Sequence, residues 1–96
     1  MTVRAPTAGR VFVDSSAYFA LANQRDDDHV GLTQVVERLV AERRRFFTTN
    51  FVLAETHALV VGRINRDVAL AVLERIEQSR LTTIRADQRA RRAAGA

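Results

Sequence analysis

The chain has 96 residues, of which 47% are hydrophobic, enough for one small domain with a real core but not for two. It contains no Cys, which excludes disulfide bridges and thiolate zinc sites and is typical of a reducing compartment. We find neither a leader segment nor an apolar stretch long enough to span a bilayer, and therefore expect one soluble, cytoplasmic domain over residues 1–96.

The charge balance is unusual because all 15 basic residues are Arg, set against 11 acidic residues, for a net charge of +4. Arginine pairs bidentately with phosphate and carboxylate, so this balance is compatible with nucleic acid or with an acidic protein partner. The absence of Lys is also what a GC-rich genome produces, and we favour that explanation.

The first structural signal is an apolar run that ends on a carboxylate. Residues 10–14 have no polar alternation before Asp14, which favours a strand covered on both faces, as in a parallel sheet. A helix is predicted to begin at Ser15 or Ser16, to run to about residue 22 and to close at Asn23. A short acid at the carboxyl end of such a strand stands where open α/β sheets place their ligands.

The next segment is the clearest helix pattern in the chain, with apolar residues at i, i+3, i+4, i+7 and i+8: Leu32, Val35, Val36, Leu39 and Val40. One buried face is expected, with Asp28 as the cap. We interpret Arg43, Arg44 and Arg45 as the last turn of this helix, where cations complement the macrodipole, rather than as an RNA-binding patch.

Residues 46–49 have strong β-propensity and are predicted to form the second strand. A third helix is expected over residues 50–61, with Gly62 as its C-cap. This helix is apolar nearly all round, which predicts a central, buried position.

A fourth, amphipathic helix is expected to start at Asn65 or Asp67, followed by a third strand over residues 81–85. Strands that alternate with helices imply right-handed crossovers and a parallel sheet. Neither GxGxxG nor GxxxxGK[ST] is present, which argues against two common nucleotide-binding folds.

Glu55 falls in the middle of the third predicted helix, on an apolar stripe. A buried carboxylate must be protonated, paired with Arg or bound to a metal, and an internal Glu–Arg bridge is a reasonable alternative to a metal site. His57 points away from Glu55 round the helix, so we interpret it as a packing residue. The acidic run before His29 is interpreted as a helix cap rather than a metal cluster.

Three stretches together resemble the PIN-domain family of metal-dependent ribonucleases, which includes toxins of bacterial toxin–antitoxin pairs: VFVDSSAYFAL, DDDHVGLTQVVERL and TTNFVLAETHALV. The resemblance covers residues 10–84. It implies a PIN-like three-layer α/β/α fold with a parallel sheet, in the order β-α-α-β-α-α-β.

The resemblance also implies the site. Asp14 and Glu55 match the first two acidic metal ligands and catalytic residues of the family, and Ser15 or Ser16 matches a supporting hydroxyl. Mg²⁺ or Mn²⁺ prefers such oxygen ligands and can activate a water against a phosphodiester. The implied partners are an RNA substrate and a cognate antitoxin protein.

The sequence departs from the family after residue 84. The family pattern continues for roughly thirty to forty residues, about one βαβ unit, and supplies a third acid that Asp87 does not match. The resemblance therefore implies a C-terminally shortened domain with an incomplete acidic site and feeble activity. It also implies that the first strand is an open edge, which favours a homo-oligomer or a protein partner.

Three hypotheses follow. The first is a metal-dependent endoribonuclease of the PIN toxin type, and the second is a catalytically inactive remnant that binds an antitoxin or a second copy. The third, a general Arg-driven RNA-binding domain, ranks last because the aromatic residues show no regular spacing for stacking.

Overall fold

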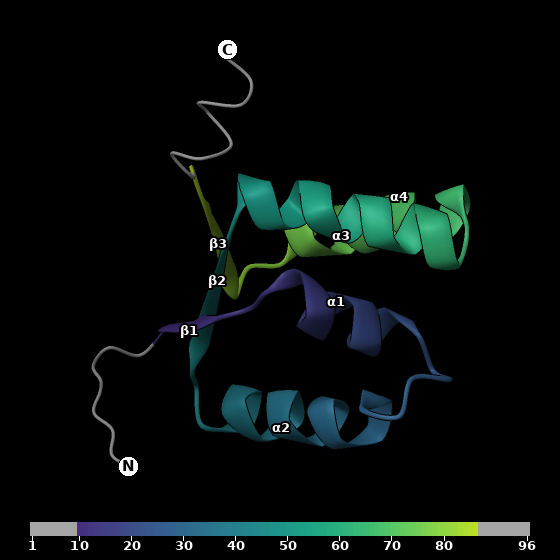
Figure 1. Cartoon of the computed structure of the whole chain (residues 1–96). Coiled ribbons are helices and arrows are strands. Elements are labelled where there is room, and N and C mark those ends of the chain that lie inside the picture. Colours follow the sequence, from purple (N-terminus) through teal and green to yellow (C-terminus); the bar gives the residue numbers. More distant parts are fainter. Residues whose placement is uncertain (1–9, 87–96) are drawn as a thin grey trace.

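The computed structural model describes residues 10–86. Within this range the elements follow the predicted order (Figure 1): β1 (Arg10–Phe12), α1 (Ser15–Ala22), α2 (His29–Ala41), β2 (Arg45–Thr49), α3 (Asn50–Arg63), α4 (Arg66–Gln78) and β3 (Thr82–Arg85). The predictions for Asp87 and for residues 1–9 lie outside the described part. No helix within it is long and apolar enough to cross a membrane.

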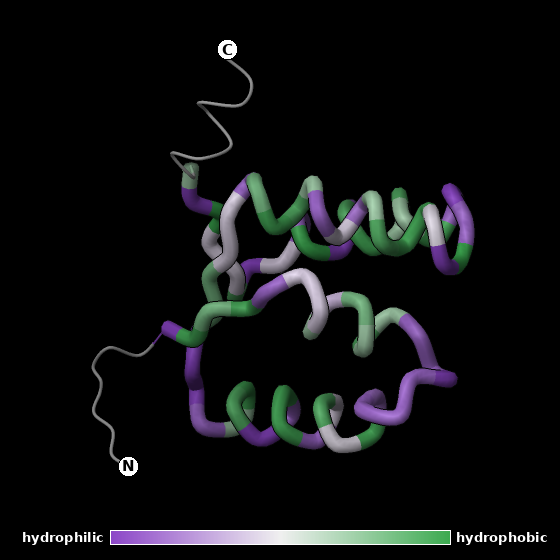
Figure 2. Tube along the Cα trace, viewed as in Figure 1, coloured by the Kyte–Doolittle hydropathy of each residue, from purple (hydrophilic) through white to green (hydrophobic). Residues whose placement is uncertain are grey.

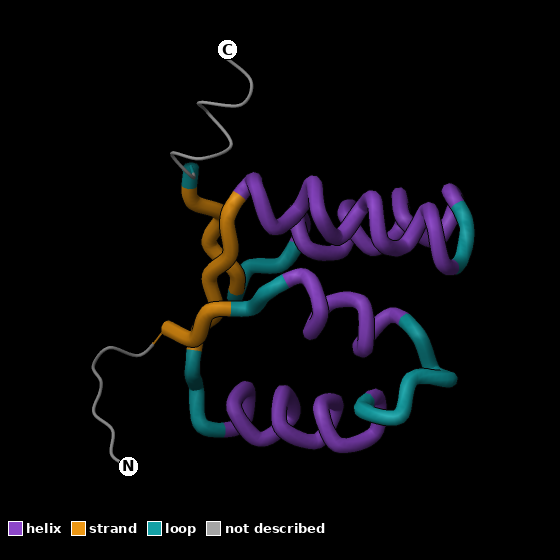
Figure 3. The backbone as a smooth tube through the Cα atoms, viewed as in Figure 1, coloured by secondary structure: helices purple, strands orange, loops and turns teal. Residues whose placement is uncertain are grey.

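The strands form a parallel sheet in the order β1-β2-β3, in which Val11 lies opposite Phe46 and Phe46 opposite Thr82. Both crossovers therefore move in the same direction along the sheet. Right-handed crossovers that move in one direction place their helices on one face, and all four helices lie on the same side of the strands (Figures 1 and 3). The predicted α/β class with a parallel sheet is confirmed, and the described residues build two of its expected three layers.

The core lies between β2 and the helices α3 and α4. Phe46 and Thr48 point towards the helices and are 7% and 0% exposed, whereas Arg45 and Phe47 alternate to the other face. Buried residues of the helices complete the core: Ala20, Val52, Thr56, Val60, Ala69 and Ile76. β1 lies at an edge of the described sheet, because its neighbour there is β2.

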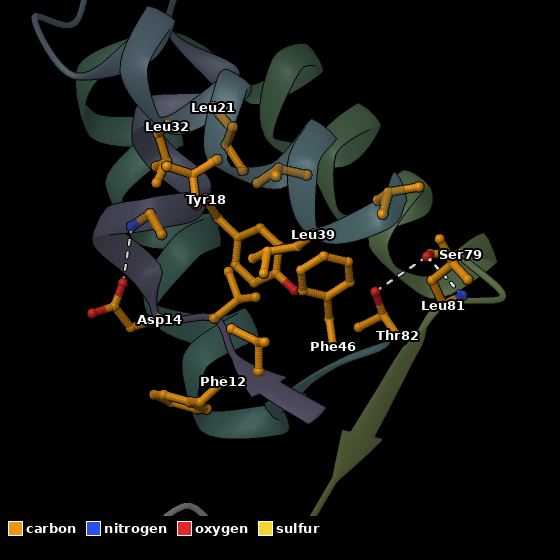
Figure 4. Close-up of a pocket in the computed structure, with 16 residues that line it drawn as sticks. Phe12, Asp14, Tyr18, Leu21, Leu32, Leu39, Phe46, Ser79, Leu81 and Thr82 are labelled. Carbon is orange, nitrogen blue, oxygen red and sulfur yellow. Dashed lines mark hydrogen bonds between the residues drawn. The ribbon is translucent and has the colours of Figure 1, made fainter. Parts of the chain in front are cut away.

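Helix α2 forms where its periodicity predicts, but the prediction that one of its faces is buried is wrong. None of its residues is buried, and Val35 and Val40 are 40% and 42% exposed. Its apolar side faces a cavity of about 370 Å³ between α1, α2 and the strands (Figure 4). Apolar and polar residues still alternate along α2 (Figure 2), so the helix is amphipathic as predicted. Its apolar side is not buried because the described residues opposite it do not cover it.

The turn after α2 corrects the interpretation of its three arginines. The Arg43 N–H donates to the Val40 carbonyl and the Arg44 N–H to the Leu39 carbonyl, both at 2.9 Å, while Arg43 adopts a φ of 62°. This is the paired pattern that ends a helix through a left-handed residue. The three arginines therefore lie beyond the helix, and Arg45 already belongs to β2.

Helix α3 also differs from its prediction. It continues through Gly62 to Arg63 and is closed at Ile64, so Gly62 is not the C-cap. It is not buried all round, because its buried residues Val52, Thr56 and Val60 lie four apart and form one narrow stripe. Helix α4 begins as expected at Asn65, whose side chain accepts a 2.8 Å hydrogen bond from the Val68 N–H.

Candidate functional site

Asp14 follows β1 directly and caps helix α1. Its Oδ1 accepts hydrogen bonds from the Ala17 N–H at 2.9 Å and from the Ser16 hydroxyl at 3.0 Å. A side-chain oxygen at this position satisfies an N–H group that the first helical turn leaves unpaired. Both of these contacts use Oδ1 of the carboxylate.

Glu55 is exposed on α3, which corrects the prediction that it is buried. It precedes the buried Thr56 by one residue, and a step of one residue turns the side chain about 100° round the helix, away from the core. Within residues 10–86, Glu55 therefore takes part in no buried Glu–Arg bridge. Because Glu55 is exposed, the cost of burying its charge gives no reason to expect a metal ion there. A metal-binding role for Glu55 therefore depends on the side chains around it.

Ser15 joins the two acidic residues. Its hydroxyl donates a long, 3.3 Å hydrogen bond to Glu55 Oε1, while the next hydroxyl, of Ser16, donates to Asp14. The four residues that the sequence singled out thus meet at one corner, where β1 leads into α1 and α3 passes beside it. Helices α1 and α3 pack against each other, which holds this corner together.

Residues on β2 fix the backbone that carries Asp14. The Val13 N–H donates to the Phe47 carbonyl at 2.9 Å, and the Thr48 hydroxyl donates to the Val13 carbonyl at 2.9 Å. Thr48 is fully buried, so its hydroxyl needs such a partner. The sequence identifies Thr48 only as a strand residue, so this positioning role was not predicted.

The phenol of Tyr18 lies behind the same corner, in the cavity under α2 (Figure 4). Its oxygen is buried and makes no hydrogen bond of ordinary geometry with the described residues. Burial raises the pKa of Tyr18, and the neighbouring Thr48 hydroxyl offsets part of that rise.

The corner supplies hard oxygen donors of the kind that Mg²⁺ and Mn²⁺ bind, namely two carboxylates and two hydroxyls. Among the described residues, no group of three or more acidic, His or Cys side chains could hold a metal ion. The donor set therefore fits an ion that keeps several waters, and does not fit a cage made wholly of protein ligands.

His29 and the acidic run before it lie elsewhere. His29 Nδ1 lies 2.8 Å from the Ala20 carbonyl and ties the start of α2 to α1, which agrees with a structural role. Asp26 Oδ1 accepts from the Asp28 N–H at 2.8 Å and shapes the loop. Asp28 occupies the N-cap position of α2, but its side chain makes no capping hydrogen bond, contrary to expectation.

Comparison with known proteins bears on the fold. No protein-family model matches the sequence, and no curated protein matches it. The described residues form a parallel α/β fold that is consistent with PIN-like proteins of the VapC type. It is similar to the crystal structure of VapC20 from Mycobacterium tuberculosis, a toxin that cleaves the sarcin–ricin loop, with a TM-score of 0.65 and 28% sequence identity. The match covers 88% of this chain and 62% of the VapC20 chain, so this chain spans less than two thirds of that toxin.

Proposed function

We propose that this protein is a metal-dependent endoribonuclease of the PIN toxin type, which hydrolyses RNA phosphodiester bonds. The main observation in support of the proposal is the hydrogen bond from Ser15 to Glu55. It places the Glu55 carboxylate at the start of helix α1, which Asp14 caps. Similarity to an RNA-cleaving toxin supports the same reading.

Asp14 and Glu55 would hold Mg²⁺ or Mn²⁺ at this corner, and such an ion supplies an activated water and stabilises charge on the phosphate. The chain's own residues set the geometry. Ser16 and the Ala17 N–H orient the Asp14 carboxylate, and Ser15 orients that of Glu55. Both carboxylates are exposed, so an RNA backbone can reach them. Two acidic side chains would hold such an ion only weakly, and slow cleavage is expected.

The proposed partners follow the same reading: an RNA substrate and a cognate antitoxin protein, in the cytoplasm. Self-association is a further part of the proposal. Within the described residues β1 has a neighbour on one side, and an edge strand offers unpaired backbone groups to a strand of a second copy.

A second candidate function is a protein-binding module without catalysis. The apolar cavity between α1, α2 and the strands favours it, because a partner side chain could fill space that α2 leaves open. This reading predicts a stable complex with antitoxin and no metal-dependent cleavage of RNA.

Calorimetric titration with Mn²⁺ tests the metal site directly. Asp14→Asn and Glu55→Gln should each weaken binding at least about tenfold, because each removes a charged ligand and keeps its shape. Asp67→Asn, which removes one exposed acid at the start of α4, is the matched control and should leave binding unchanged.

Cleavage of a labelled RNA by the same four proteins completes the test. Mn²⁺-dependent cleavage by the parent chain and by Asp67→Asn alone supports the nuclease. Equal Mn²⁺ affinity in all four proteins sinks the metal site. Metal binding without cleavage, together with a stable antitoxin complex, favours the second candidate.

A further inference from the structure

The backbone of Val13, the residue before Asp14, is held by β2 at both of its polar groups. Its N–H donates to the Phe47 carbonyl at 2.9 Å, and its carbonyl accepts a hydrogen bond from the Thr48 hydroxyl at 2.9 Å. The first contact joins two backbones, so it does not depend on the side chain at position 47. The second contact needs a hydroxyl, and Thr48 supplies it from a side chain that is 0% exposed.

The Thr48 contact fixes the peptide group through which Asp14 is attached. A peptide group is planar, so the Val13 carbonyl and the Asp14 N–H turn together, and rotation of this plane moves the Asp14 side chain. Towards its other side Asp14 is held by helix α1. Its carbonyl accepts from the Tyr18 N–H at 3.1 Å, and its Oδ1 accepts from the Ala17 N–H at 2.9 Å. Thr48 therefore connects the carboxylate to the central strand through one peptide group.

A second buried threonine shows what the Thr48 contact adds. Thr56 is also 0% exposed, and its hydroxyl donates to the Val52 carbonyl at 2.8 Å. That acceptor lies one turn earlier in the same helix, so the contact connects α3 only to itself. The Thr48 contact instead spans 35 positions of the sequence and ends one residue before Asp14. Two threonines of equal burial thus differ in what their hydroxyls hold.

We propose that Thr48 is a positioning residue for the acidic corner of Asp14 and Glu55. It touches neither carboxylate, but it holds that of Asp14 in the orientation that metal binding requires. The inference rests on the proposed nuclease function and deepens it, because it makes the metal affinity depend on a residue in the core of the sheet. Without the hydroxyl, the Val13 carbonyl would lose this partner and its peptide group would turn towards another one.

Calorimetric titration with Mn²⁺ of the parent and three variants tests the proposal. Replacement of a residue that orients a metal ligand weakens metal binding about 10- to 100-fold, and Thr48→Val, which exchanges the hydroxyl for a methyl, should reach the lower end of that range. Thr48→Ser deletes a buried methyl group and lowers stability, but it keeps the hydroxyl and should bind Mn²⁺ like the parent. Thr56→Val is the matched control and should leave the Mn²⁺ affinity unchanged.

Urea unfolding of the same variants separates positioning from general stability. If Thr48 acted only by stabilising the fold, the Mn²⁺ affinities would follow the free energies of unfolding. The proposal instead requires that Thr48→Ser and Thr56→Val lose stability without losing Mn²⁺ affinity, and that Thr48→Val lose both.

The Ala17 amide proton supplies a measurement without metal, because the Ala17 N–H donates to Asp14 Oδ1. A hydrogen bond to a carboxylate is a strong one, so its loss is visible in the NMR spectrum of the amide. In EDTA, Thr48→Val should move this resonance upfield, whereas Thr48→Ser and Thr56→Val should leave it in place.

The proposal is overturned if Thr48→Val binds Mn²⁺ as tightly as the parent, if Thr56→Val loses the same affinity, or if Thr48→Ser does not restore it. A parent chain that binds no Mn²⁺ would refute the metal site of the proposed nuclease. The Ala17 amide then decides the role of Thr48 alone: a displaced resonance in Thr48→Val supports positioning of Asp14, and an unchanged one overturns it.

Discussion

The half of the molecule built by β2, α3 and α4 is packed, whereas the half that contains α2 is not. Val60 and Ala69 are fully buried in the first half, and among residues 10–86 every buried residue except Ala20 belongs to it. Helix α2 contributes none, and its Val30 is 65% exposed. Yet α2 is about as strongly amphipathic as α4, and α3 is only weakly so.

The difference separates two properties that a hydrophobic pattern combines. Periodicity reports which side of a helix is apolar. It does not report how much surface the rest of the chain places opposite that side. Helix α3 lies between α1 and α4 and beside β2, so even a narrow stripe is buried, while α2 packs mainly on α1 and borders the cavity.

The largest expected effect contrasts the two halves directly. Ile76→Ala should lower the free energy of unfolding by about 3 kcal/mol, because it opens a cavity among buried neighbours. Val40→Ala on α2 should cost less than about 0.5 kcal/mol, since that side chain is 42% exposed and borders the cavity instead of packed neighbours. Urea unfolding measures both. Similar losses for the two variants would mean that α2 is packed in solution as tightly as α4, and the comparison would fail.

The helix starts provide a second contrast, of intermediate size. Asn65→Ala should destabilise the protein by about 1 kcal/mol, because it removes the side-chain cap of the Val68 N–H. Asp28→Ala should cost less than about 0.5 kcal/mol, as its side chain caps nothing. Thermal unfolding of the two variants gives the comparison. A larger loss in Asp28→Ala than in Asn65→Ala would contradict the assignment of the two caps.

The smallest effect appears only at alkaline pH and reports on the cavity. Burial raises the pKa of Tyr18 above its ordinary value of 10.0, so the folded state favours the neutral phenol. Stability should therefore be level below about pH 10 and fall as the pH rises further, since the unfolded chain loses that proton first. The sequence has one Tyr and neither Lys nor Cys, so no other side chain titrates between about pH 9 and pH 12.

Absorbance of the phenolate and urea unfolding across this range follow the same group. Tyr18→Phe should abolish the alkaline loss of stability. An ordinary phenol pKa in the parent would show that water fills the cavity and reaches the ring.

The sequence predicted the element order, the parallel sheet, the caps at Asn65 and Asn23, and the positions of Asp14, Ser15 and Ser16. These depend on local chemistry, which short segments carry. The exposure of Glu55 could not be predicted, because a helix with apolar residues all round gives no direction to its buried side. The pairing of Phe12 with Phe47 was missed for a related reason. The two rings lie 35 positions apart in the sequence, and the strand register alone brings them together.

The left-handed turn at Arg43 determines which side chains of β2 face the helices. The helix end is closed by the Arg44 N–H, and β2 begins at the very next residue, so no spare residue separates the two. Side chains of a strand alternate between faces, and a shift of one residue exchanges them. One residue added to this turn would send Phe46 and Thr48 to the face of the sheet away from the four helices and turn Arg45 and Phe47 towards them. A two-residue insertion would preserve the alternation, so the spacing tolerates even changes far better than odd ones.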